Sequence, residues 1–254
     1  MPERAHYSRA PITEAIIDLR IAPTQGISVE ELSPIREAVG DRYPNQEEEH
    51  VQYQQMALVG TNLLQTGGGH QLNGFRFISQ DKRQIFYARL DGFAFSIQAP
   101  YDRWESFRDE ARNLWNVYSS VAIPEGVTRA ATRYINRIDI PDAASVQLEN
   151  YLRIYPEVSP DLPDEGLMSN FFMQLQLWQR DLGCWLVVNE APDMSPAEGT
   201  MSIRLDFDLF REQYEEPWRA DEDTAVWDFL EQLHDRKNEI FEASITEKTR
   251  RLIR

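Results

Sequence analysis

The chain has 254 residues, a formal net charge of −16 and a single cysteine. Hydrophobic residues make up 42% of the chain, which excludes disorder over its whole length. A uniformly acidic surface repels phosphate backbones and anionic membranes, so nucleic-acid binding is disfavoured. Cys184 lies in an apolar run, which excludes an intrachain disulfide and is typical of a small buried side chain. No apolar run reaches the ~18–20 residues of a membrane span and no signal peptide is evident, so we expect a cytoplasmic protein.

The first half of the chain predicts a strand, a helix, several strands and a second helix. Residues 12–21 alternate apolar and polar side chains, as a strand does. Ser28 and Glu31 form a capping-box pattern that predicts a helix over residues 28–39. Aromatic and aliphatic residues at helical spacing predict the second helix, which ends near residue 120. The further strands are expected at 51–59, 74–79, 84–90 and 92–98, with a flexible hairpin tip at residues 67–70 (Gly-Gly-Gly-His).

The second half repeats this order. Residues 128–140 predict a long strand, and residues 145–153 a weaker helix. A final helix over residues 224–254 would be ~46 Å long, more than a domain of this size needs, so we expect its end to fray, bend or contact another subunit. The further strands are expected at 170–178, 183–190 and 200–210, followed by an acidic loop at 211–223.

Two landmarks recur at nearly the same distance. Asp18 and Arg137 stand 119 residues apart in similar strands that exchange acid and base, and Trp104 and Trp227 stand 123 apart at helix starts. We therefore predict an α+β fold built as a tandem pseudo-two-fold repeat of strand, helix, strands and helix. The repeats would be residues 1–125 and 126–254 in one compact unit, with a curved antiparallel sheet, helices on one face and a long C-terminal helix.

Such a repeat would pair the first strands of the two halves at the centre of the sheet. Asp18 would then lie beside Arg137, and Arg20 beside Asp139, as opposite charges that fix the strand register. The alternative is coincidence between two isoleucine-rich strands. The charged residues of these strands are candidate ligand-binding or register-fixing residues: Glu14, Asp18, Arg20, Arg129, Arg133, Arg137 and Asp139.

This charged face has two interpretations. In the first, its arginines bind an anion such as a nucleotide phosphate or a carboxylate. In the second, the charges neutralise one another as a network of ion pairs. Four bases against three acids nearly cancel, which favours the ion-pair network.

Three segments resemble a known family. They are residues 10–20 (APITEAIIDLR), residues 133–138 (RYINRI) and a closing segment with Leu233, His234, Phe241, Ile245 and Thr246. Together they resemble a family of sporadically distributed, uncharacterised bacterial and archaeal proteins of about this length. The resemblance covers nearly the whole chain and implies a prokaryotic protein in a single unit. It implies no activity, cofactor or catalytic residue, and the patchy distribution associates the family with mobile, accessory or defence-related gene neighbourhoods.

Other residue patterns give little support for catalysis. The histidines, His6, His50, His70 and His234, lack the spacing of a metal motif, and one cysteine does not complete a zinc site. No Gly-x-Ser-x-Gly elbow or Cys–His pair is evident. We therefore predict no cofactor, no metal and no catalytic residue. Asp206 and Asp208 alternate with apolar residues, as on the solvent side of a half-buried strand.

Trp218 follows two glutamates in an acidic loop. An exposed tryptophan there would anchor a protein partner, whereas a buried one would fill the core. The sequence thus favours a non-enzymatic binding or interaction protein with a protein partner or a second copy. The alternative is an anion- or nucleotide-binding enzyme or sensor that uses the arginine-lined sheet face for a small anionic ligand.

Overall fold

The computed structural model describes residues 7, 9–22, 27–59, 62–143, 146–159, 161, 170–193, 198–219 and 223–254, without the side chains of 53–59, 62–67 and 223. It is an α+β fold with one large, unclosed antiparallel sheet, as predicted. Its helices are α1 (Ile35–Val39), α2 (Trp104–Ala122), α3 (Asp223–Ser244) and α4 (Glu247–Ile253), with 3-10 helices η1 (Val29–Leu32) and η3 (Leu148–Asn150). Its strands are β1 (Ile12–Ile21), β2 (Asn45–Val59), β3 (Asn62–Ile78), β4 (Gln84–Arg89), β5 (Gly92–Gln98), β6 (Gly126–Pro141), β7 (Met173–Gln179), β8 (Cys184–Pro192), β9 (Thr200–Glu212) and β10 (Trp218–Arg219).

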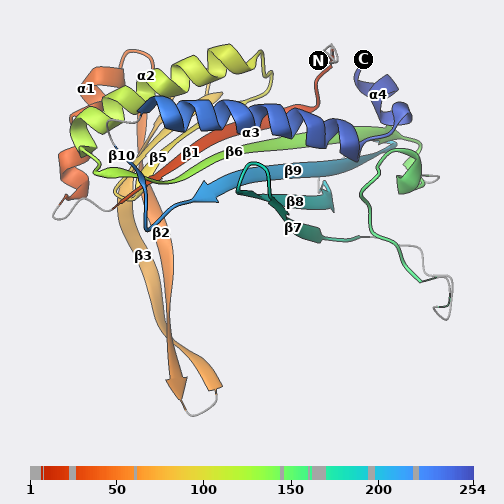
Figure 1. Ribbon diagram of the computed structural model, residues 1–254, viewed down its shortest axis with the longest axis horizontal. Coiled ribbons are helices and arrows are strands. Elements are labelled where there is room, and N and C mark those ends of the chain that lie inside the picture. Colours follow the sequence, from red (N-terminus) through yellow and green to blue (C-terminus); the bar gives the residue numbers. More distant parts are fainter. Residues whose placement is uncertain are drawn as a thin grey trace.

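Strands from both halves of the chain join the same sheet (Figure 1). Their order across the sheet is β2-β3-β4-β5-β1-β6-β9-β8-β7, and β10 pairs with β6. β1 and β6 therefore lie side by side in the interior of the sheet, antiparallel to each other. β2 and β3 form a long hairpin that extends away from the rest of the molecule.

The hydrophobic core lies between the sheet and the helices. Ala15, Ile17 and Leu19 alternate on one face of β1 and are fully buried. On this face, Phe93 of β5 contacts Trp115 of α2 with 5.7 Å between ring centroids. We call this the helix-covered face. The opposite face carries Asp18 and is called the open face.

α2 forms where it was predicted. Its apolar positions at intervals of three and four, Trp104, Phe107, Ala111, Leu114, Trp115 and Tyr118, are all buried. This spacing places them on one side of the helix, against the sheet. Packing of that apolar stripe, more than intrinsic propensity, accounts for a stable helix of this length.

Proline interrupts the helix predicted over residues 28–39. The capping box holds, because the Ser28 backbone N–H donates to Glu31 at 2.7 Å. However, only the 3-10 helix η1 follows, and α1 starts after Pro34. Proline lacks a backbone N–H and restricts the residue before it, so a continuous α-helix ends there.

Two further expectations differ from the structure. Residues 67–70 are not a hairpin tip. They lie inside β3 and pair with β2, because the two strands of this hairpin extend beyond the segments in which apolar and polar residues alternate. The helix predicted over residues 145–153 is reduced to η3 within residues 146–153, the part of this segment that the structure describes. The C-terminal helix bends, which is one of the outcomes expected for it: α3 ends at Ser244, Ile245 forms a bridge with Leu152, and α4 follows. Among the described residues, no helix is long and apolar enough to cross a membrane.

Candidate functional site

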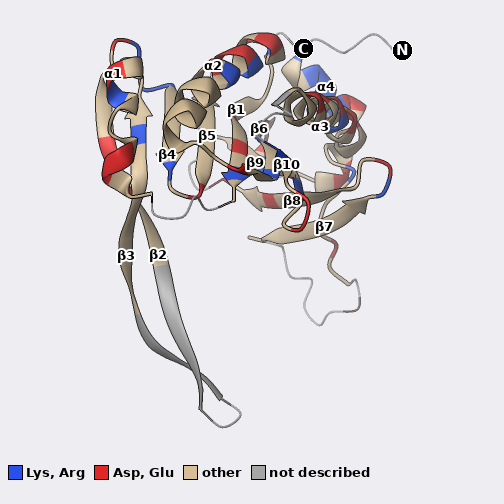
Figure 2. Cartoon of the chain, turned by 60° about the vertical axis from the view of Figure 1, so that its left-hand side comes forward, with Lys and Arg blue, Asp and Glu red and all other residues tan. Residues whose placement is uncertain are grey.

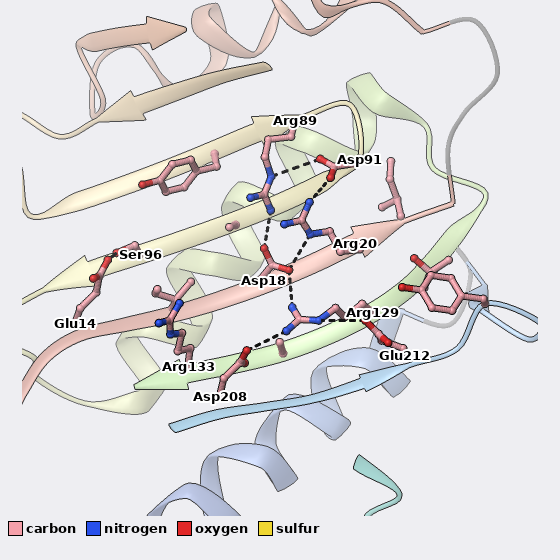
Figure 3. Close-up of a pocket in the computed structure, with 17 residues that line it drawn as sticks. Glu14, Asp18, Arg20, Arg89, Asp91, Ser96, Arg129, Arg133, Asp208 and Glu212 are labelled. Carbon is pink, nitrogen blue, oxygen red and sulfur yellow. Dashed lines mark hydrogen bonds and ion pairs between the residues drawn. The ribbon is translucent and has the colours of Figure 1, made fainter. Parts of the chain in front are cut away.

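A pocket of about 740 Å³ lies on the open face. Side chains of β1, β4, β5, β6 and β9 line it, together with Tyr214 after β9 (Figure 3). Small-molecule sites usually measure roughly 300–1,000 Å³, so its size suits a small ligand.

Strand register places the charges of the pocket together. Asp18 of β1 stands opposite Ala94 of β5 on one side and Ala131 of β6 on the other. These two small side chains leave room above Asp18. Arg20 stands directly opposite Arg129, and such a pair of like charges is unfavourable unless an acid lies between them.

Asp18 is that acid, and three arginines converge on it (Figure 3). Arg129 Nη1 donates to Asp18 Oδ1 at 2.8 Å, and Arg20 Nε donates to the same oxygen at 3.2 Å. Arg89 Nη2 donates to Oδ2 at 2.6 Å. The Asp18 side chain is only 16% exposed, so this cluster is largely shielded from water.

The three arginines keep Asp18 ionised. Burial alone would raise the pKa of Asp18, but the positive charges of the arginines outweigh it and hold the pKa below its ordinary value. Charge-assisted hydrogen bonds of this kind fix the guanidinium planes as well as neutralising them. Asp18 is therefore the carboxylate around which the arginines of the pocket wall are arranged.

Further carboxylates extend the network from this cluster. Asp91 accepts from Arg20 and, at 2.9 Å, from the amide of Asn73. Asp208 accepts from Arg129 Nη2 at 3.2 Å. Burial raises the pKa of Asp208, and the nearby arginine charges only partly offset this effect.

Arg133 forms a second, separate ion pair in the pocket. Its cross-strand neighbour is Asp208, yet its Nε and Nη2 donate to the two oxygens of Asp206 at 2.8 and 2.6 Å. Asp206 also accepts from Asn189 at 3.2 Å. Ser96 donates to Glu14 in the same region (Figure 3). The Arg133 side chain is 43% exposed and lines the pocket, while Asp206 holds its guanidinium group in place.

The charges that line the pocket nearly cancel. Four of its residues are arginines and five are carboxylates: Arg20, Arg89, Arg129 and Arg133, with Glu14, Asp18, Asp91, Asp208 and Glu212. The arrangement therefore offers fixed positive and negative groups at short range, and no large excess of either.

The predicted pairing of Asp18 with Arg137 and of Arg20 with Asp139 is wrong. β1 and β6 are neighbours, but Asp18 stands opposite Ala131, six residues before Arg137. Arg137 lies instead beside Pro11, whose carbonyl accepts its backbone N–H at 2.9 Å. The exchanged charges did not set the register: Asp18 pairs across the strands with Arg129, and Arg137 pairs with Asp139 of its own strand.

Five of the predicted residues line the pocket: Glu14, Asp18, Arg20, Arg129 and Arg133. Arg137 and Asp139 do not. They pair with each other through Arg137 Nε and Asp139 Oδ1 at 2.9 Å, and Ser202 also donates to Asp139. Both lie farther along β6 and form a separate ion pair.

Trp218 is not an exposed anchor for a partner. Its side chain is 7% exposed and packs against Phe229 of α3 with 5.5 Å between ring centroids. β10 pairs with the start of β6 and turns this residue inward. Trp218 therefore fills the core.

Asp206, which holds Arg133 from outside the pocket lining, was missed from the sequence, as were several residues that line the pocket. Asp206 is 4% exposed and bonded to Arg133, so the expectation of a solvent-facing strand side is wrong for it. Asp208 on the same side of β9 reaches Arg129. Arg89 is the last residue of β4 and Asp91 lies in the β4–β5 turn, and both reach side chains of β1 only because of the sheet order. The alternation of residues 206–209 could have indicated the two aspartates.

Within the described ranges, no three His, Cys, Asp or Glu side chains are placed to hold a metal ion. Comparison of the chain with protein-family models, with curated proteins and with solved structures found no match.

Proposed function

We propose that this protein is a non-enzymatic binding protein, and that its open-face pocket holds a small ligand carrying both positive and negative groups. The observation that carries the proposal is the near balance of four arginines and five carboxylates around a pocket of small-molecule size. A protein partner presenting such groups on a short segment would use the same surface.

The pocket is pre-organised for binding. Asp18 holds three guanidinium groups in place, and Asp206 holds a fourth by two hydrogen bonds. Fixed donors and acceptors lose little entropy when a ligand arrives. The Ser96 hydroxyl donates to Glu14, but Ser96 is buried. We therefore assign Ser96 the role of holding the Glu14 carboxylate in the pocket wall.

A second candidate is an anion- or nucleotide-binding enzyme or sensor. Arg89 favours it, because its Nε is buried and has no hydrogen-bond acceptor among the described residues. The exposed part of Arg133 supplies another donor. Against it, each arginine of the pocket is already paired with a carboxylate, so an anion would have to compete with these bonds.

A thermal-shift screen separates these candidates. The full chain is heated with zwitterionic amino acids and short peptides, with phosphate and nucleotides, and with polyamines. A ligand at 100 times its Kd adds about 2.7 kcal/mol to the free energy of unfolding, which raises the Tm by about 5–10 °C for a chain of this size. We expect the zwitterions to give this shift.

Variants locate the binding. We expect Arg133→Gln and Glu14→Gln to abolish the zwitterion shift. Arg204→Gln is the matched control, because Arg204 lies on the same face outside the pocket, is 53% exposed and pairs with Asp193 at 3.6 Å. Circular dichroism checks that each variant folds. A response only to anions would replace our proposal by the second candidate, and a shift equally large in the two pocket variants would refute a site in this pocket.

We also propose that the two halves are copies of one unit. What supports this is the equivalent order of elements: β5 neighbours β1 and precedes α2, while β9 neighbours β6 and precedes α3. A superposition of the two halves tests it. Matching β1 on β6 should also bring α2 onto α3, and failure to do so would contradict the repeat.

A further inference from the structure

The outer edge of β7 has the properties of an interface. β7 is the last strand in the sheet order and pairs with β8 on one side only, among the strands the structure describes (Figure 1). An edge strand carries a row of backbone N–H and C=O groups that can pair with another chain.

β7 lacks the features that usually protect such an edge. Its sequence, MQLQLWQ, contains no charged residue and no proline (Figure 2). Its register with β8 is continuous, without a bulge. Proteins commonly protect edge strands with charges, prolines or bulges. In a chain with 27% charged residues, a neutral strand at this position is unexpected unless it is covered.

Large apolar side chains are exposed on both faces of this edge. Leu177 is 43% exposed on the helix-covered face, and Trp178 is 50% exposed on the open face. Trp178 contacts Trp185 of β8, with 4.9 Å between ring centroids, and Trp185 is itself 36% exposed. Phe172, directly before the strand, is 70% exposed. Exposed apolar side chains thus lie on both faces at the C-terminal part of β7, at its neighbour β8 and directly before the strand.

We propose that the occupant of this edge is a second copy of the chain, paired antiparallel through β7 about a two-fold axis. Charge selects β7 over the other edge of the sheet for such a contact. Two chains of net charge −16 repel each other, so self-association requires a neutral contact surface. β7 supplies one, whereas β2 at the other end of the sheet carries Glu47, Glu48 and Glu49 and would oppose like charges.

The sequence of β7 is complementary to itself in this arrangement. If Gln176 stands opposite Gln176 of the second copy, Leu175 stands opposite Leu177 on the helix-covered face. Trp178 then stands opposite Gln174 on the open face. Antiparallel partners share a face, so all these contacts are sterically consistent with an isologous interface. The dimer would continue the sheet across the two-fold axis and place both pockets on the same side.

The oligomeric state of the full chain tests this proposal. Size-exclusion chromatography with light scattering at high micromolar concentration should give twice the chain mass of 29.6 kDa. We expect Trp178→Lys to weaken the dimer at least tenfold, because the substitution acts twice per interface. Gln176→Lys, at an exposed position, places two lysines opposite each other and should weaken it several-fold.

Val51→Lys is the control, because Val51 is 45% exposed on the opposite edge strand. It should leave the dimer unchanged. Circular dichroism at each concentration shows whether the variants are folded. A monomeric wild-type chain, or a dimer that survives both β7 substitutions, would overturn the proposal.

Discussion

Replacing Asp18 with alanine is expected to lower the free energy of unfolding by about 3–5 kcal/mol, the usual effect of removing one partner from a buried ion pair. Three arginines converge on this carboxylate, which is 16% exposed. Its loss leaves Arg20 and Arg129 directly opposite each other without the acid that separates their charges. Urea unfolding at neutral pH, followed by circular dichroism, measures the effect.

Asp139→Ala is the matched control for Asp18→Ala. Asp139 also pairs with an arginine on a central strand, but its side chain is 51% exposed. We expect that control to cost at most about 1 kcal/mol, as exposed ion pairs do. Equal effects of the two substitutions would show that the three-arginine cluster does not stabilise the sheet.

Glu190→Gln should make the protein more stable at neutral and alkaline pH. Glu190 is fully buried on β8, and neither carboxylate oxygen has a hydrogen-bond partner among the described residues. Burial raises the pKa of Glu190 to about 8. The folded protein therefore holds a proton that the unfolded chain releases above its ordinary pKa near 4.5.

The sign of the pH dependence follows from this proton. Between about pH 4.5 and pH 8 the folded state binds more protons, so raising the pH lowers the free energy of unfolding. Across this window the wild type should lose about 3–5 kcal/mol relative to Glu190→Gln. Urea titrations at several pH values measure the difference, with the exposed Glu149→Gln as control. A constant difference between wild type and Glu190→Gln would contradict a raised pKa.

Local patterns were sufficient to predict most elements of the fold. The alternation of β1 predicts which residues are buried, and the strands predicted at residues 84–90 and 92–98 correspond to the paired strands β4 and β5. Helical spacing predicts α2. Pro34 shows the limit of such patterns, because a capping box and apolar spacing were outweighed by one missing backbone N–H.

The site was predicted only as far as single strands allow. The arginines and acids of β1 and β6 were found because charges at every second position share a face. The ion-pair partners of these residues were not predicted. Several pairings of opposite charges are available between the strands, and the register decides which of them forms. Arg89 reaches Asp18 because β5 and β4 follow β1 in the sheet, and no local pattern gives that order.

His234 was considered from the sequence as a metal ligand, and its burial, with an exposed fraction of 6%, was not predicted. It stacks on Trp104 with 4.5 Å between ring centroids, and its Nδ1 lies 3.1 Å from the Tyr134 hydroxyl. The apolar stripe of α3 passes through Leu233, so a neighbouring polar residue could have been assigned to the same side. A buried histidine needs a hydrogen-bond partner, and that partner comes from a strand about 100 residues away.

Arginine Nε–Hε resonances of the labelled full chain, recorded by NMR during titration with the zwitterion that gives the largest thermal shift, test the binding site most directly. We expect the signals of Arg89, Arg129 and Arg133 to move with ligand concentration, while those of Arg137 and Arg204 stay in place. Movement of the last two signals alone would show that the ligand binds elsewhere and that the open-face pocket is not its site.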